Sequence, residues 1–234
     1  MIPLRDVNPS RGTPVVTYVL IALCLGAFLY ELSRGRDLHE FLLRYGLVPA
    51  HYFQAEIRHH LTLWEQALPF LTSMFLHGGW LHLIGNMWVL RIFGDNVEGE
   101  LGHGKYLLFY LCSGGCAAFI QLVTDPGSSI PTIGASGAVA GVMGAYFVLY
   151  PRAKILTFVP ILVFFTLAEL PAYVFLGFWF LLQFFSGTLS LMADGRGFSN
   201  VAWWAHIGGF LGGIVLLKLF HRRPLPPEHF DEFD

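Results

Sequence analysis

Apolar segments long enough, or nearly long enough, to cross a bilayer recur along the chain and are separated by shorter polar stretches. A helix needs about 20 apolar residues to span the hydrocarbon core. The pattern therefore predicts six membrane-spanning helices. We expect them at about Pro14–Tyr30, Leu76–Val97, Lys105–Thr124, Ala135–Tyr150, Pro171–Gly187 and Val201–Phe220.

The remaining segments are accessory. Glu31–Gln66 has a mixed polar and apolar helical pattern, which suggests an interfacial insertion. The apolar run Ile155–Gly187 is too long for one upright span, so we expect Ile155–Ala168 to lie partly along the interface. A short segment at 1–13 and a polar tail at 221–234 complete the chain. The expected fold is all-α, a single polytopic membrane domain of residues 1–234 with a six-helix bundle.

Composition supports a membrane location. The chain is 55% hydrophobic and 13% charged, whereas soluble domains carry about 25% charged residues. The net charge of −2 gives no reason to expect a nucleic-acid partner. Cys24, Cys112 and Cys116 fall in apolar runs and form no disulfide or zinc pattern. The first apolar run ends without a small-residue cleavage site, so we interpret it as a retained span and not a signal peptide.

Six spans place both termini on one side of the membrane. That side would carry eight basic residues and the opposite side five, which favours cytoplasmic termini. The short termini suit a bacterial inner membrane. In this topology the span that begins near Ala135 starts at the extracytoplasmic side, with Ser136 in its first turn.

Ser136 lies in the small-residue stretch PTIGASGAVAGVMGAY. A serine in such a helix often serves only to bond neighbouring helices or its own backbone. A nucleophilic serine needs a base within hydrogen-bond reach, and His206 is the strong candidate. Two hypotheses, helix contact and catalysis, follow from this residue alone.

His206 lies beside a pair of glycines, Gly209 and Gly213, and Ser136 lies beside Gly137 and Gly141. Each pair, four residues apart, makes a flat helix face, and two such faces can approach closely. Their contact would bring the serine hydroxyl to the imidazole. The alternative for His206 is a hydrogen-bonded interior histidine.

His82 and Asn86 are four residues apart and share one helix face. Both can donate hydrogen bonds to a developing oxyanion. The alternative is interhelical hydrogen bonding with no chemical role. His77 either braces this site or faces water. Arg91 and Asp95, again four residues apart, are expected to form a local ion pair.

The motifs GASG (134–137), AHIGG (205–209) and HGGWLHLIGN (77–86) resemble, in order and spacing, the signature motifs of the rhomboid intramembrane serine proteases. The resemblance runs from about Thr72 to Gly213. It implies a six-helix bundle with Ser136 as nucleophile and His206 as general base. His82, Asn86 and the Ser136 backbone N–H would form the oxyanion hole.

The resemblance also implies single-pass transmembrane protein substrates, cut in or near the bilayer, a lipid environment, and no metal or cofactor. Two positions depart from the family pattern. Leu68-Pro69 replaces a Trp-Arg pair of the first outer loop, and Ala140 replaces an aromatic residue that stacks on the histidine. These departures concern loop anchoring and histidine orientation.

Other function classes fit less well. A transporter or channel usually shows mid-membrane acidic residues or inverted repeats, which the chain lacks. It also lacks an HExxH motif for a zinc protease. A catalytically silent rhomboid-like scaffold that binds transmembrane helices stays open. The bulky fifth apolar segment and the loop Leu191–Asn200 are the expected moving parts for substrate access.

Overall fold

The computed structural model describes residues 1–10, 12–161, 164–192 and 201–221. The tail at 222–234 and most of the loop Leu191–Asn200 lie outside the described residues. The elements in chain order are β1 (Ile2–Asp6), α1 (Val15–Ser33), the 3-10 turn η1 (Gly35–Asp37), α2 (Leu38–Tyr45), α3 (Ala50–Phe53), α4 (Ala55–Arg58), α5 (Leu63–Thr72), α6 (Trp80–Leu101), α7 (His103–Thr124), α8 (Ser136–Leu149), β2 (Lys154–Ile161), β3 (Phe164–Pro171), α9 (Ala172–Met192) and α10 (Trp203–Phe220).

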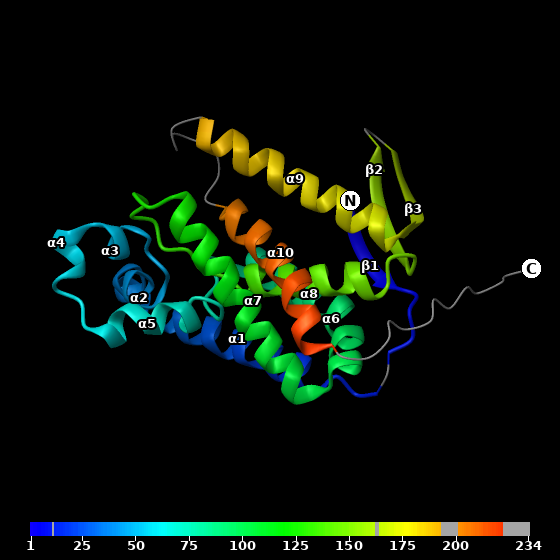
Figure 1. Ribbon diagram of the computed structural model, residues 1–234, viewed down its shortest axis with the longest axis horizontal. Coiled ribbons are helices and arrows are strands. Elements are labelled where there is room, and N and C mark those ends of the chain that lie inside the picture. The colour runs from blue at the N-terminus through cyan, green and yellow to red at the C-terminus, as the bar shows by residue number, and fades with distance from the viewer. Residues whose placement is uncertain (11, 162–163, 193–200, 222–234) are drawn as a thin grey trace, which may run out of the picture.

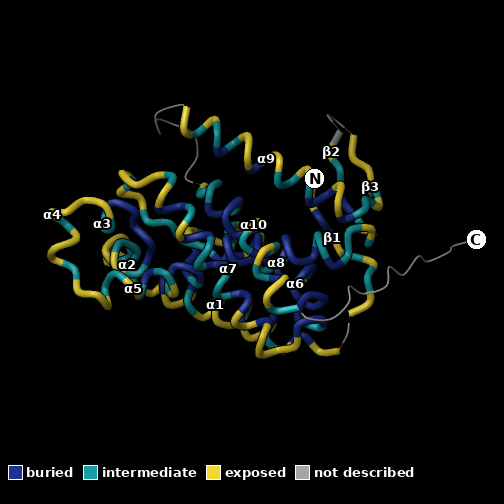
Figure 2. Tube along the Cα trace, in the orientation of Figure 1, coloured by how far each residue is buried: buried dark blue, intermediate teal, exposed yellow. Residues whose placement is uncertain are grey.

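Helix α8 lies at the centre of the bundle, with α6, α7 and α10 packed around it (Figure 1). Every residue from Gly137 to Tyr146 is buried, which gives the dark segment in the middle of Figure 2. Most of these side chains are small, so neighbouring backbones can approach α8 closely. The centre of the fold is therefore set by close backbone contact.

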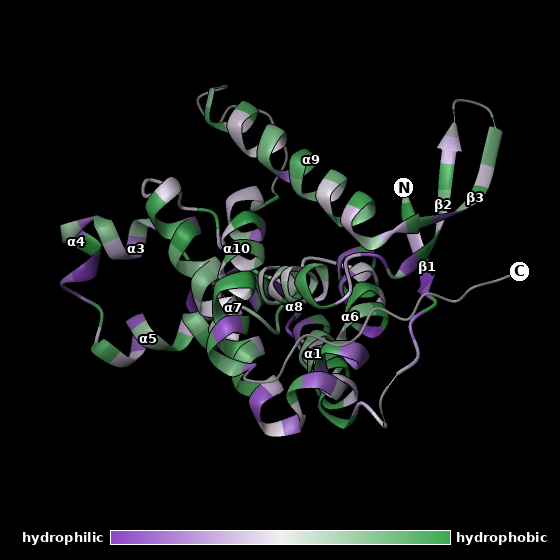
Figure 3. Ribbon diagram, turned by 45° about the vertical axis from the view of Figure 1, so that its right-hand side comes forward, coloured by the Kyte–Doolittle hydropathy of each residue, from purple (hydrophilic) through white to green (hydrophobic). Residues whose placement is uncertain are grey.

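Six helices, α1 and α6 to α10, coincide with the six predicted spans. Within the described residues, four of them are long and apolar enough to cross a membrane: α1, α7, α9 and α10. Their content of hydrophobic residues gives the green ribbon of Figure 3, seen clearly in α9. Helix α8 has 14 residues, and α6 carries charged residues towards its C-terminal end. The membrane location is supported by these four helices, and the count of six spans stays a prediction.

The expectation of an all-α fold is wrong in one region. Lys154–Pro171 forms a β-hairpin in which Lys154 pairs with Pro171 and Ile161 with Phe164. Strand β1 adds to β2, so the described residues contain a three-stranded antiparallel sheet in the order β1-β2-β3. The residues that prefer strands are β-branched or aromatic, and KILTFVPI is rich in them. Periodicity alone cannot separate a short apolar strand from a helix segment.

The sheet is joined to the bundle through the N-terminal strand. Asp6 accepts hydrogen bonds from the Tyr146 hydroxyl and from Asn96 Nδ2, each at 2.8 Å. Trp88 Nε1 donates to the Pro3 carbonyl at 2.6 Å. Burial raises the pKa of Asp6 to about 7. A partly buried carboxyl group therefore links β1 to α6 and α8.

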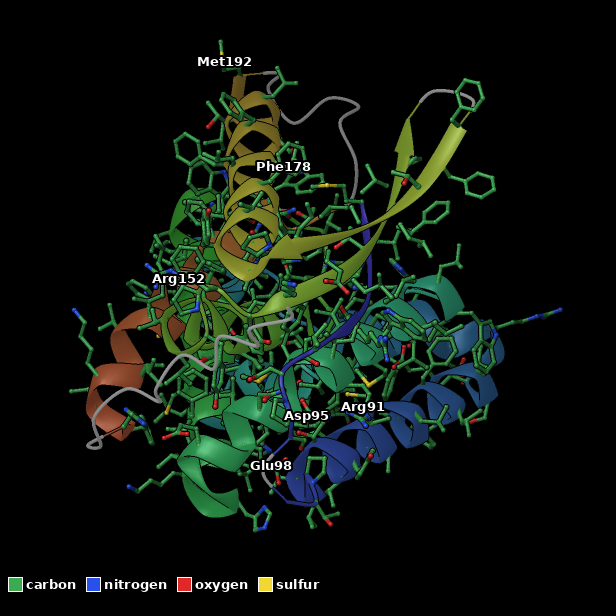
Figure 4. All side chains as sticks on the ribbon, turned by 90° about the vertical axis from the view of Figure 1, so that its right-hand side faces the viewer. Arg91, Asp95, Glu98, Arg152, Phe178 and Met192 are labelled. Carbon is green, nitrogen blue, oxygen red and sulfur yellow. The ribbon has the colours of Figure 1, made fainter. Side chains whose placement is uncertain are left out.

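Glu98, near the end of α6, anchors the beginning of α1 (Figure 4). Its carboxylate accepts the backbone N–H groups of Val16 and Thr17, both at 2.8 Å. A negative charge at a helix N-terminus is stabilising because the free N–H groups there carry partial positive charge. Glu98 also contacts His103 at 2.6 Å. The predicted Arg91–Asp95 ion pair, one turn earlier, is confirmed at 2.9 Å.

The long first loop contains the short elements η1 and α2 to α5, which lie on the opposite side of Figure 1 from the sheet. Leu63 and Trp64, at the start of α5, are 85% and 69% exposed. Pro69 lies inside α5 and is buried. The Leu68-Pro69 pair is thus part of a helix that begins with a Thr62–Glu65 capping box.

Candidate active site

Ser136 and His206 are adjacent although 70 residues separate them in the sequence. Ser136 is the first residue of α8, and His206 lies in the first turns of α10. The Ser136 Oγ and His206 Nε2 atoms are 2.8 Å apart, and both residues are half-buried. This is hydrogen-bond distance for a hydroxyl that donates to an imidazole nitrogen.

The two glycine faces bring these residues together, as predicted. A Cβ atom added to Gly209 would collide with the carbonyl oxygen of Gly137, and one added to Gly213 would collide with that of Gly141. Close contact of small-residue faces lets two helix backbones touch. The expected contact between the fourth and sixth predicted spans is therefore confirmed, and it holds Ser136 beside His206.

His82 and Asn86 face the turn that leads into α8. Gly134 has a φ of +125°, a conformation that favours glycine. A Cβ atom at this position would lie 2.7 Å from His82 Nε2 and 3.6 Å from Asn86 Nδ2. Both side chains thus direct a nitrogen towards the backbone two residues before Ser136. The structure brings together all four residues singled out by the sequence.

The surroundings of His82 determine which of its nitrogens carries the proton. The Gly78 backbone N–H donates to His82 Nδ1 at 3.4 Å. Because Nδ1 accepts this hydrogen bond, the proton of the neutral ring is on Nε2. That N–H is the one that faces Gly134.

Asn86 has unused donor capacity. Its side chain is 8% exposed, and its Nδ2 atom has no hydrogen-bond partner among the residues that the structure describes. Buried polar groups without a partner are uncommon and often mark a functional site. The amide is therefore available to an oxygen atom that enters the space beside Ser136.

His77 is buried and does not face water. Its side chain is 2% exposed, and its ring centroid lies 5.3 Å from that of His82. The Glu31 carboxylate, on α1, accepts the His77 backbone N–H at 3.1 Å. Of the two interpretations of His77, the bracing one agrees with these contacts. The role of Glu31 was not anticipated, because the sequence places it at the edge of an apolar run.

Helix α9 supplies two neighbours of His206 that the sequence analysis missed. The Gln183 side chain is 7% exposed, and its Oε1 atom lies 2.7 Å from His206 Nδ1. The Trp179 ring centroid lies 6.0 Å from that of His206. Ala140, the position expected to bear on histidine orientation, is buried in α8 and carries only a methyl group. The one sequence signal for Gln183 was that it is the single amide in the apolar segment FLGFWFLLQFF.

The arrangement combines a hydroxyl, an imidazole that can take its proton, and two donors on the neighbouring helix. These are the parts needed for nucleophilic attack on a carbonyl carbon. Among the described residues, no group of three or more His, Cys, Asp or Glu side chains is placed to hold a metal ion.

Comparison with known proteins gives the family. Residues 63–223 match the description "Rhomboid domain". Presenilin-associated rhomboid-like protein A, mitochondrial, of Danio rerio is 30% identical over 159 residues, 67% of this chain and 38% of that protein. Rhomboid protease GluP of Bacillus subtilis is 34% identical over 137 residues, 58% of this chain and 25% of that protein. Rhomboid-like protein 11, chloroplastic, of Arabidopsis thaliana is 30% identical over 183 residues, 74% of this chain and 61% of that protein.

The chain thus spans less than two thirds of the length of each of these relatives. One of them comes from a bacterium, but the other two are named as mitochondrial and chloroplastic proteins. The expected bacterial inner membrane is therefore not supported. An integral membrane location is supported by the family and by the apolar helices. Because the matched region covers more than half of the sequence and contains Ser136 and His206, the chain belongs to the rhomboid family.

Proposed function

We propose that this chain is an intramembrane serine endopeptidase that cleaves single-pass transmembrane proteins in or near the bilayer. The observation that carries the proposal is the 2.8 Å approach of Ser136 Oγ to His206 Nε2. Family membership adds support, since one relative is named as a rhomboid protease.

In the first half of the reaction, Ser136 Oγ attacks the substrate carbonyl carbon while His206 Nε2 takes the hydroxyl proton. The carbonyl oxygen becomes an oxyanion. The Ser136 backbone N–H, His82 Nε2–H and the free Asn86 amide are the donors for it. Collapse of the tetrahedral intermediate breaks the peptide bond, and His206 gives its proton to the leaving amine.

In the second half, a water molecule attacks the acyl-serine ester. His206 takes a proton from this water, and the ester bond breaks to release the carboxylic acid. His206 then returns the proton to Ser136. Each proton transfer in these steps uses His206 Nε2, which lies 2.8 Å from Ser136 Oγ.

Water can reach Ser136 if the serine lies in a recess open to one aqueous side. A helix of the length of α8, 14 residues, extends about 21 Å, whereas the hydrocarbon core is about 30 Å thick. With Leu149 near one membrane surface, Ser136 would lie roughly 9 Å inside the other. Helices α6, α7 and α10 pack around α8, so its short length and the polar side chains of α6 fit a bundle interior. We also propose that the chain forms a single membrane domain with six membrane spans and cytoplasmic termini.

The substrate helix must unwind before Oγ can reach a peptide bond. Helices that contain glycine or other weak helix formers unwind most readily, so these are the expected substrates. A folded helix with strong helix formers at the same depth should be cleaved slowly.

The direct test is covalent labelling of the purified full chain in detergent with a fluorophosphonate probe, which reacts with an activated serine. We expect the wild-type protein to be labelled at Ser136, and Ser136→Ala and His206→Ala to remain unlabelled. Cleavage of a single-pass test substrate should follow the same order. An unlabelled wild-type protein that still binds transmembrane helices would favour the catalytically silent scaffold.

A further inference from the structure

Helix α9 touches the bundle along one narrow stripe. Its buried residues are Ala172, Phe175, Leu176, Gln183 and Gly187. Separations of three, four and seven residues among them place them on one face of the helix. Gln183 is the amide in this otherwise apolar stripe. Burial of an amide is unfavourable unless the amide is hydrogen-bonded, so its partner is informative.

That partner is His206. Gln183 Oε1 lies 2.7 Å from Nδ1, and an amide oxygen can only accept a hydrogen bond. Nδ1 must therefore carry the ring proton. The lone pair is then on Nε2, the atom that faces Ser136 Oγ. In the other tautomer Nε2 would carry the proton and could not take one from the serine.

The same helix also supports the ring of His206. Trp179 precedes Gln183 by one turn, and its ring is tilted by 35° to the imidazole at a centroid distance of 6.0 Å. Trp203, on α10, contacts the imidazole at 6.3 Å and a nearly perpendicular angle. Gly187 packs against Trp203 and Trp204, so α9 lies close to the first turn of α10.

We propose that Gln183 is a positioning residue for His206, assisted by Trp179. It selects the tautomer in which Nε2 is the base and takes the place that an acidic residue holds in a three-residue protease site. The inference rests on the proposed function for its kinetic consequence. Because both groups belong to α9, His206 is held in its working state only while α9 lies against α10.

The kinetic test uses Gln183→Leu, which removes the acceptor, and Gln183→Glu, which retains it. Gln183→Leu should lower kcat by about 10- to 100-fold, by analogy with the loss found when the hydrogen-bond partner of a metal-bound histidine is removed, with a much smaller change in KM. Gln183→Glu should restore most of this loss. It should also move the low-pH limb of the kcat profile to higher pH, because a carboxylate stabilises the imidazolium ion.

Thr188→Val is the matched control. The Thr188 hydroxyl donates to the Phe184 carbonyl of its own helix at 2.8 Å, so its loss removes a polar group of α9 without touching His206. Wild-type kcat is expected. If Gln183→Leu cleaves as fast as this control, or if Gln183→Glu folds and leaves the pH profile unchanged, Gln183 does not position His206.

A second readout does not depend on proteolysis. Side-chain ¹⁵N spectra of histidine-labelled protein distinguish Nδ1–H from Nε2–H, and a His206→Asn spectrum identifies the His206 signals. We expect the Nδ1–H tautomer in the wild type and a mixture in Gln183→Leu. If the tautomer changes in this way but wild-type protein is never labelled by fluorophosphonate, the Gln183–His206 hydrogen bond is supported and the protease proposal is contradicted. An unchanged tautomer would overturn the inference while leaving the protease proposal standing.

Discussion

Gly209 of α10 lies so close to the carbonyl oxygen of Gly137 of α8 that no Cβ atom fits between them. Ser136 precedes Gly137 directly, and His206 precedes Gly209 by one turn. The approach of the two backbones therefore determines the distance between Oγ and Nε2.

Gly209→Ala should separate α8 and α10 and lengthen this distance. Overpacking of a close contact costs about 1–3 kcal/mol, so the variant should unfold at lower temperature and label slowly with fluorophosphonate. Gly115→Ala is the control, because a Cβ atom at Gly115 meets no atom within 4 Å. Rapid labelling of Gly209→Ala at the wild-type unfolding temperature would contradict this account.

Asn86→Ala should slow cleavage without loss of stability. Removal of one oxyanion donor costs about 2.7–4 kcal/mol in the transition state, or roughly 10²- to 10³-fold in kcat. The Asn86 amide nitrogen has no partner among the described residues, so its removal leaves no described group unsatisfied. Steady-state kinetics and thermal unfolding measured on one preparation would check both parts.

His82→Ala should give a similar loss of kcat, since its Nε2–H faces the same turn. The loss should not add fully to that of Asn86→Ala, because both donors act on one oxygen atom. The double variant measures this coupling. Wild-type turnover in either single variant would remove that residue from the mechanism.

Stability should depend on pH through Asp6. Burial raises the pKa of Asp6 from 3.8 to about 7, so the folded state favours the protonated acid. Its contribution to stability is full below about pH 4 and is lost as the pH rises through 7. The largest contribution of Asp6 to the free energy of unfolding is about 4 kcal/mol. Solvent screening of this partly exposed group makes the actual contribution smaller.

Asp6→Asn should flatten this dependence, because an amide oxygen can still accept from Tyr146 and Asn96. Denaturant unfolding between pH 4 and pH 8 is the measurement. A wild-type protein whose stability rises over this range would show that ionised Asp6 is favoured in the fold.

Glu98→Gln should loosen the beginning of α1. The buried carboxylate accepts two backbone N–H groups and the Thr17 hydroxyl, and hydrogen bonds to a charged group are worth about 1.5–3 kcal/mol each. We expect a loss of roughly 1–3 kcal/mol in the free energy of unfolding, since the amide retains one acceptor. Glu40→Gln, at an exposed position in the first turn of α2, removes only a surface charge near a helix N-terminus and should cost less than about 1 kcal/mol under the same conditions.

Much of the site could be predicted from the chain itself. The glycine pairs at 137/141 and 209/213 are local patterns with one structural use, the close approach of two helices. The residues beside them, Ser136 and His206, are brought together by that contact. The i, i+4 spacing of His82 and Asn86 likewise placed both on one face of α6.

Other features depended on which surfaces meet. Helix α9 is apolar on all sides, so its sequence does not indicate that Gln183 faces α10; only the packing of the two helices decides this. The hairpin Lys154–Pro171 was missed for a related reason. Its apolar run suits either a strand or a helix, and its partner strand β1 lies about 150 residues earlier in the chain. Local spacing was therefore enough to single out Ser136, His206, His82 and Asn86. The tertiary structure alone decided that Gln183 accepts from His206 and that β1 joins the hairpin, because each of these contacts joins groups that are distant in sequence.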